Sequence, residues 1–288
     1  MLTVKLLHYL LSLIMKTYLL FIICLINYSL IANTPDISVP YKFTKEGELK
    51  LHIFFPNGHR ISDSKPVILF FFAGGWVGGE PKQFFRQCKY LASRGIVAIS
   101  GEYRIEKKHG TSPKECVMDA KSAVRWVRIN AEKLGVNPSR FIVGGGSAGG
   151  HIAAATATLS GYNEAGEDTS VSCIPDALVL YNPVFDNGPG CFGHNKVKDY
   201  WQKISPKHNI STAVPPTIIF QGTDDHLVDL SSPQDFRAQL IALGVRCELL
   251  IYEDQEHGFF NQAKFRETML QTDRFLSSLG YLSGKPTL

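Results

Sequence analysis

The chain has 288 residues, of which 44% are hydrophobic and 19% charged, and its formal net charge is +4. This composition is too apolar for a disordered chain, and the length allows one large domain or two small ones. Lysine and arginine are scattered and form no basic run interleaved with aromatic residues. We therefore expect no nucleic-acid partner.

The first 32 residues form an apolar leader that is interrupted by Lys16. From Met15 onward the leader has a basic start, a short apolar core and a small residue, Ala32, which is the outline of a secretory signal peptide. We expect export, to a secreted or periplasmic location. The alternative is a retained N-terminal anchor over residues 6–30. It would place Lys16 inside the bilayer at a cost of about 2.5–3.5 kcal/mol, and only this alternative gives the protein a membrane contact.

Strands and helices alternate after the leader. Strands are expected at residues 49–55, 66–73, 96–100, 140–144, 176–183, 216–222 and 247–252. Helices are expected at residues 83–93, 116–134, directly after Ser147, 231–244 and 264–279. Continuous apolar runs such as PVILFFFA are typical of strands buried on both faces. The alternation predicts an α/β fold, with a mostly parallel central sheet and helices on both faces, in one domain over residues 35–288.

The segment from Phe185 to Pro215 breaks this alternation. It is long for a connection inside a compact domain, and such loops are often lids or binding elements. Phe192, Tyr200 and Trp201 give it aromatic surface. We expect a small lid at about residues 185–215, whose size favours a short-acyl substrate over a long-chain lipid.

Five glycines surround Ser147 in the sequence FIVGGGSAGGHIA, residues 141–153. The serine lies in a G-x-S-x-G pattern between an expected strand and an expected helix, which is the context of a nucleophile elbow. At such a sharp turn the neighbours must be small to avoid the adjacent strand and helix. The same residues also fit the G-x-G-x-x-G spacing of a dinucleotide-binding turn. That alternative is disfavoured because the motif lies in mid-chain and lacks an acidic strand end about 20 residues later.

A nucleophilic serine needs a base and an acid that orients the base, in the chain order Ser, Asp or Glu, His for this kind of elbow. Asp224 and Asp225 both follow the strand that ends at Gly222. His257 follows the last strand and precedes the final helix, so it is the candidate base. His151 is expected to be a packed or surface residue, and His226 to flank the site.

Acyl transfer also needs hydrogen-bond donors for the oxyanion. The backbone N–H of Ala148, directly after the serine, is one candidate. The sequence FFAGGWVGG, residues 71–79, follows an early strand and supplies others; a simple tight turn is the alternative interpretation.

Neither a metal nor an organic cofactor is expected. Cys191 and His194 provide two potential metal ligands, but no second pair completes a zinc site. The six cysteines include no CxxC pair, and five remain after removal of the leader. We expect buried or singly paired thiols.

Together these motifs resemble the α/β-hydrolase superfamily, and within it the hormone-sensitive-lipase and carboxylesterase branch with its feruloyl- and acetyl-esterase-like members. The resemblance covers about residues 45–280 and rests on FFFAGGWVGG, GEYRI, AVRWVRINAEKLGVNPSRF, GGSAGGH, QGTDDHLV and EHGFF. It implies the α/β-hydrolase fold and a carboxylesterase-type serine hydrolase with an acyl-serine intermediate. The family spacing G-x-x-D-x-x-V selects Asp225 over Asp224, which completes a catalytic set of Ser147, Asp225 and His257.

The oxyanion loop departs from the branch, which usually carries H-G-G-G-W. Aligned on Trp76, Phe72 takes the place of the histidine and Ala73 that of the first glycine. The resemblance assigns the backbone donors to Gly74 and Gly75, together with Ala148. We expect Phe72 to pack beneath the loop against the sheet and to hold it by contact rather than by hydrogen bonds.

The resemblance and the expected export favour a small-molecule or polysaccharide ester as substrate, with a short acyl group or a sugar or aryl component. Two alternatives remain open. One is an arylformamidase-like amidase, whose family also uses a Gly-Gly-x-Trp oxyanion loop. The other is a non-catalytic ligand-binding protein on a hydrolase scaffold, which usually lacks the histidine that is present here as His257.

Overall fold

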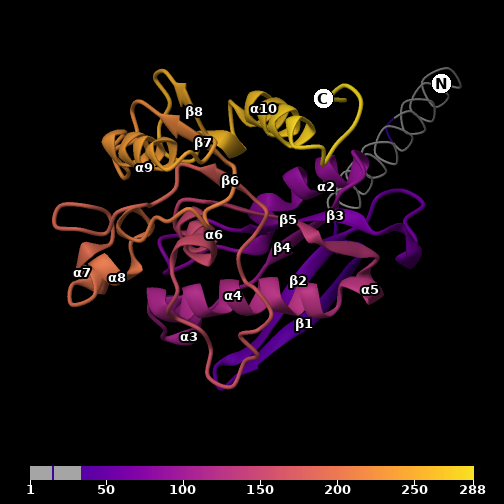
Figure 1. Ribbon diagram of the computed structural model, residues 1–288, viewed down its shortest axis with the longest axis horizontal. Helices are drawn as coiled ribbons and strands as arrows, with labels where there is room; N and C mark the ends of the chain where they lie inside the picture. The colour runs from indigo at the N-terminus through magenta and orange to yellow at the C-terminus, as the bar shows by residue number, and fades with distance from the viewer. Residues whose placement is uncertain (1–14, 16–33) are drawn as a thin grey trace, which may run out of the picture. The chain divides into compact units, whose positions relative to one another are not determined.

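The computed structural model describes Met15 and residues 34–288 (Figure 1). The predicted leader, apart from Met15, lies outside the described residues. Residues Asp36–Leu288 form one compact unit. Within the described part of the chain, no helix combines the length and the hydropathy needed to cross a membrane.

An eight-stranded sheet forms the centre of this unit, in the order β1-β2-β4-β3-β5-β6-β7-β8. The strands are β1 (Ile37–Thr44), β2 (Gly47–Phe54), β3 (Lys65–Phe71), β4 (Val97–Gly101), β5 (Val136–Gly146), β6 (Ala177–Tyr181), β7 (Thr217–Gly222) and β8 (Cys247–Tyr252). β2 pairs antiparallel with both β1 and β4, whereas all other neighbours are parallel. The predicted α/β fold with a mostly parallel sheet is confirmed.

Helices cover both faces of the sheet. They are α2 (Phe85–Ser93), α3 (Glu106–His109), α4 (Pro113–Ile129), α5 (Ala131–Leu134), α6 (Ala148–Thr158), α7 (His194–Val197), α8 (Trp201–Ile204), α9 (Ser231–Ala242) and α10 (Phe265–Ser278). α2 and α10 lie together, because Tyr90 on α2 and Arg94 at its C-terminal end both donate hydrogen bonds to Asp273 on α10. α4 and α6 pack against each other. Figure 1 shows α4 on the opposite side of the sheet from α2 and α10.

β1 was not predicted from the sequence, and its position explains why. It is an edge strand, and most of its residues are partly or fully exposed, so it has no continuous apolar run. Pro40 also interrupts the pattern, and the pairing of β1 with β2 shifts register between Pro40 and Lys42. Proline is tolerated in sheets mainly on edge strands and at such irregularities.

The helix predicted at residues 116–134 is wrong in its limits. α4 begins at Pro113, because Ser112 caps it and the Glu115 carboxylate accepts a hydrogen bond from the Ser112 N–H. It ends at Ile129, where the Asn130 side chain donates to the Trp126 carbonyl, 2.9 Å away. The short helix α5 then completes the segment, and β5 starts at Val136, four residues before the strand expected at residues 140–144.

The segment expected to be a lid connects β6 to β7 and contains α7, α8 and a 3₁₀ turn, Pro206–His208. Polar contacts tie it to neighbouring helices. Lys196 pairs with Glu106 in α3, and the Lys207 ammonium lies 2.8 Å from the Asp235 carboxylate in α9. The segment is therefore packed onto the domain as an ordered connection.

Candidate active site

Ser147 lies at the turn between β5 and α6 in a backbone conformation that side chains rarely adopt. Its φ is 51° and its ψ is −117°, which for a residue other than glycine stores strain. The Ser147 N–H donates to the Tyr181 carbonyl at 2.9 Å, and its carbonyl accepts from the N–H groups of His151 and Val184. These bonds from neighbouring elements hold the strained turn in place.

The glycines around Ser147 allow close approach of backbone to backbone. A Cβ atom on Gly149 would lie 2.1 Å from the Phe71 carbonyl oxygen, and one on Gly145 would lie 2.5 Å from Gly149. Contacts this short do not occur in proteins, so β3, β5 and α6 can meet at the turn only if these positions lack side chains. The glycine density noted in the sequence thus has a geometric cause.

Asp225 and His257 meet at the carboxyl end of the sheet. The Asp225 Oδ2 atom lies 2.7 Å from the His257 Nδ1 atom. Asp224, the alternative acid, is exposed, and its N–H donates to the Gln255 carbonyl. The structure therefore pairs His257 with Asp225.

Four donors surround the Asp225 carboxylate. Its Oδ1 accepts from the N–H groups of Leu227 and Val228, and its Oδ2 accepts from the Gln221 amide as well as from His257. Burial by itself would raise the pKa of Asp225, but the hydrogen bond and charge of His257 and the two backbone donors outweigh it, so this pKa is lowered. Asp225 is thus held as a carboxylate.

The other ring nitrogen of His257 faces Asn182, which directly follows β6. The Asn182 Nδ2 and His257 Nε2 atoms are 3.2 Å apart. Within residues 34–288, no hydrogen bond joins the Ser147 hydroxyl to His257. Catalytic hydrogen bonds are often loose without substrate. Sequence analysis missed Asn182, and the only local signal was an asparagine at a strand end before Pro183.

The predicted oxyanion donors are free to bind a ligand atom. The N–H groups of Gly74, Gly75 and Ala148 donate to no acceptor in the described part of the chain. Gly74 has a φ of 150° and Gly75 one of 61°, values that favour glycine. The loop closes through the Gly74 carbonyl, which accepts from the N–H groups of Val77 and Gly78 at 3.0 Å each.

Phe72 packs beneath this loop, as predicted. It is 2% exposed, and its ring stacks on Tyr103 with 4.2 Å between the ring centroids. Two hydrogen bonds to its backbone also support the loop. The Tyr103 hydroxyl donates to the Phe72 carbonyl at 2.8 Å, and the Ala73 N–H donates to the Gln83 side chain at 2.6 Å. Gln83 and Tyr103 were missed because they come from other parts of the chain.

The remaining candidate residues of the sequence are two further histidines and the cysteines. His151 is fully buried and donates from Nε2 to the Ile204 carbonyl, and burial lowers its pKa to about 4. His226 is exposed beside Asp225. Across residues 34–288, no group of three or more His, Cys, Asp or Glu side chains is arranged to hold a metal ion. The five cysteines in that range are free thiols, and Cys88, Cys116, Cys173 and Cys247 are buried.

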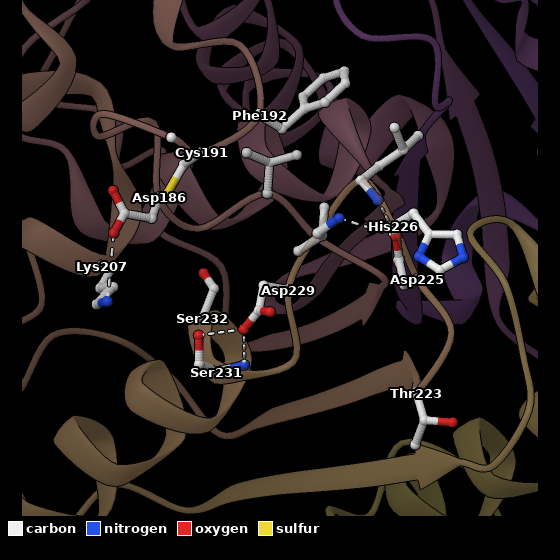
Figure 2. Close-up of a pocket in the computed structure, with 14 residues that line it drawn as sticks. Asp186, Cys191, Phe192, Lys207, Thr223, Asp225, His226, Asp229, Ser231 and Ser232 are labelled. Atoms are coloured by element: carbon white, nitrogen blue, oxygen red, sulfur yellow. Dashed lines mark hydrogen bonds and ion pairs between the residues drawn. The ribbon is translucent and has the colours of Figure 1, made fainter.

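A cavity of about 490 Å³ lies between Asp225 and the segment of residues 185–215 (Figure 2). Figure 2 shows Asp186 and Lys207 on one side of it and Asp225 and His226 on the other. Other polar lining residues are Asp229, Ser231 and Ser232 at the start of α9. Phe192 contributes an apolar ring from the lid segment. The cavity is therefore predominantly polar, and of the three candidate catalytic residues only Asp225 lines it.

Several known proteins are similar to this chain in sequence and in fold. Residues 51–177 match the BD-FAE family. The carboxylesterase NlhH of Mycobacterium tuberculosis (strain ATCC 25618 / H37Rv) is 32% identical over 240 residues, which cover 75% of this chain and 72% of that protein. The probable isoprenylcysteine alpha-carbonyl methylesterase ICMEL1 of Arabidopsis thaliana is 25% identical over 232 residues, or 72% of this chain. The chain spans about half or less of the length of three of the curated relatives that it matches, namely 48%, 36% and 49%.

Among solved structures, Thermogutta terrifontis esterase 2 phosphoramylated by tabun superimposes with a TM-score of 0.83 at 38% identity, over 86% of this chain and 96% of that one. Its propionate-bound form gives a TM-score of 0.81 at 36% identity with the same coverage. The fold, the strand-to-helix turn at Ser147 and the sequence identity to known esterases agree. The chain therefore belongs to the α/β-hydrolase esterase family.

Proposed function

We propose that the chain is a serine carboxylesterase that hydrolyses short-acyl esters through an acyl-serine intermediate, with Ser147 as nucleophile, His257 as base and Asp225 as the orienting acid. The observation that carries the proposal is the 2.7 Å contact between Asp225 and His257 at the same end of the sheet as the strained Ser147. Thermogutta terrifontis esterase 2, which binds propionate and butyrate and is phosphorylated by paraoxon, supports it as a relative.

In this mechanism His257 Nε2 takes the Ser147 proton as the serine oxygen attacks the ester carbonyl. The carbonyl oxygen becomes an oxyanion, which accepts hydrogen bonds from the N–H groups of Gly74, Gly75 and Ala148. The C–O bond to the alcohol then breaks, and His257 returns the proton to the leaving alkoxide. Water, activated by the same histidine, releases the acid and regenerates the serine.

The polar cavity supports a finer proposal about the substrate. Asp186, Lys207, Asp229, Ser231 and Ser232 present both hydrogen-bond donors and acceptors around a volume of about 490 Å³. A hydroxyl-rich group such as a sugar satisfies such a mixed lining better than an alkyl chain does. We therefore favour esters of sugars or of similarly polar alcohols, of small-molecule or polysaccharide size.

A panel of substrates tests the function. Purified protein is assayed with acetyl, butyryl, octanoyl and feruloyl esters, an acetylated sugar and an aryl formamide. We expect the acetyl and butyryl esters to be the best substrates. Ser147→Ala should lower turnover by at least about 10³-fold with unchanged circular dichroism, while the exposed Ser160→Ala serves as control. Preferred cleavage of the formamide favours an amidase, and a folded protein that is inactive on the whole panel favours a ligand-binding role.

We also propose that residues 15–32 direct export. The basic start, apolar core and Ala32 support this. Expression of the full chain, followed by N-terminal sequencing of the mature protein, should reveal a new N-terminus near residue 33; an uncleaved chain in the membrane fraction would identify an anchor instead.

A further inference from the structure

Asn182 occupies a constrained position between the turn that carries Ser147 and the loop that carries His257. Its side chain is fully buried, and its φ is 36°, a left-handed conformation that asparagine tolerates better than most residues do. Its N–H donates to the Phe220 carbonyl in β7 at 2.7 Å. The preceding residue, Tyr181, accepts the Ser147 N–H. Asn182 is therefore held from both sides by the strands that carry the catalytic groups.

The hydrogen bonds of the Asn182 side chain are directional. The Asn182 Oδ1 atom lies 3.2 Å from the Gly258 nitrogen, and because that N–H only donates, the amide oxygen must face it. The amide nitrogen is then directed to His257 Nε2, 3.2 Å away. The Asp225 carboxylate accepts from Nδ1 of the same ring, so the neutral imidazole carries its proton on Nδ1 and offers a lone pair at Nε2. Asn182 can thus donate to that lone pair.

We propose that Asn182 is a positioning residue for the base: it fixes the His257–Gly258 loop through its oxygen, and it engages the Nε2 lone pair of the resting enzyme through its nitrogen. This inference rests on the proposed function, in which Nε2 receives the Ser147 proton.

The contact with Asn182 depends on the protonation state of His257. A neutral imidazole accepts a hydrogen bond at Nε2, whereas a protonated imidazole has a hydrogen there and repels the amide N–H. Asn182 therefore favours the neutral ring, which is the form that can act as a base, and it must release Nε2 when the serine proton arrives. In the range 34–288, Asp225 is the only charged side chain within 4.0 Å of the His257 ring nitrogens, so these two partners set the state of the base.

Two substitutions distinguish the role of the Asn182 amide oxygen from that of the Asn182 amide nitrogen. Asn182→Gly removes the side chain while remaining compatible with the left-handed backbone. Asn182→Asp keeps the shape and the acceptor for Gly258 but turns a second acceptor toward Nε2, which favours the protonated ring. With p-nitrophenyl acetate, Asn182→Gly should lower kcat by about 10- to 100-fold with KM changed by less than about threefold. Asn182→Asp should move the acid limb of the pH profile of kcat/KM upward by about one pH unit or more.

Ser64→Gly is the matched control, because Ser64 also has a left-handed φ, 52°, and lies outside the site. Circular dichroism and thermal melts establish that each variant is folded. If Asn182→Gly keeps the wild-type kcat, or if a folded Asn182→Asp shows an unshifted acid limb, the positioning role is overturned while the esterase assignment stands. A wild type that hydrolyses no ester overturns the proposed function and this inference with it.

Discussion

At the scale of single residues, Asp225 differs from its neighbour Asp224 in what its carboxylate contacts. Both oxygens of Asp225 accept hydrogen bonds, from two backbone N–H groups and the Gln221 amide, and one of them fixes the proton of His257 on Nδ1. Asp224 is exposed, and within residues 34–288 no hydrogen bond or ion pair joins its carboxylate to His257. The two acids are adjacent in sequence, so the same substitution at each position tests which of them orients His257.

Asp225→Asn should lower kcat by about 10⁴-fold, because an amide nitrogen beside Nδ1 favours the wrong tautomer of His257. Asp224→Asn should change kcat by less than about threefold, because it lies outside the hydrogen-bond network. Steady-state kinetics on the preferred ester measures both. If the larger loss falls on Asp224→Asn, the acid has been assigned to the wrong residue.

At the scale of elements, the loop after β3 depends on glycine geometry. A Cβ on Gly74 would lie 2.0 Å from the Gly78 carbonyl oxygen, whereas a Cβ on Gly78 would meet nothing within 4 Å. Gly74→Ala should therefore displace the loop and its donors and lower kcat by at least about 10²-fold, while Gly78→Ala stays within about twofold of wild type. Kinetics with circular dichroism distinguishes a displaced loop from an unfolded protein, and equal activities of the two variants would argue against the proposed oxyanion donors.

Phe72 supports the same loop from below. Phe72→Ala should lower the free energy of unfolding by about 3–5 kcal/mol, because it removes a buried ring from its stack with Tyr103. Phe72→His should change it by no more than about 1–2 kcal/mol, since the ring is partly replaced but a buried imidazole needs new partners. Urea unfolding measures both. A greater loss for histidine than for alanine would contradict the packing role.

Some residues of the site and most strands could be predicted from the sequence and others could not, for a physical reason. Ser147 and Asp225 each follow a buried strand end, and His257 follows the half-buried strand β8, so a local pattern places all three at one edge of the sheet. Asn182 and Tyr103 act through partners that are 75 and 31 positions away in the sequence, and Gln83 acts through the backbone of Ala73, 10 positions away. Composition and periodicity carry no information on such pairs. Likewise, the exposed edge strand β1 lacks the apolar run by which the central strands were recognised.

At the scale of the whole molecule, several tyrosines link stability to alkaline pH. Burial is the main cause that raises the pKa of Tyr90, Tyr252 and Tyr281 to about 12 each, and for Tyr90 the hydrogen bond to Asp273 adds to it. The unfolded chain loses these protons near pH 10 and the folded chain only near pH 12. Between these values the unfolded state binds fewer protons, so the stability falls as the pH rises.

The denaturant midpoint should accordingly fall most steeply between about pH 10 and about pH 12. Tyr90→Phe, which removes one of the three groups, should flatten this fall while lowering the stability at neutral pH through the lost bond to Asp273. Guanidinium titrations at a series of pH values measure both effects. If the curves of the variant and the wild type run parallel, Tyr90 does not contribute to the alkaline transition.

The connection from β6 to β7 has a consequence for how such an enzyme changes over generations. Residues 185–215 form one uninterrupted stretch of chain, supply Asp186, Cys191, Phe192 and Lys207 to the cavity wall, and contain none of Ser147, Asp225 and His257. A recombination event within this stretch changes one side of the cavity and leaves Ser147, Asp225 and His257 as they were inherited. A library of variants confined to these residues would therefore vary one side of the cavity without substituting Ser147, Asp225 or His257.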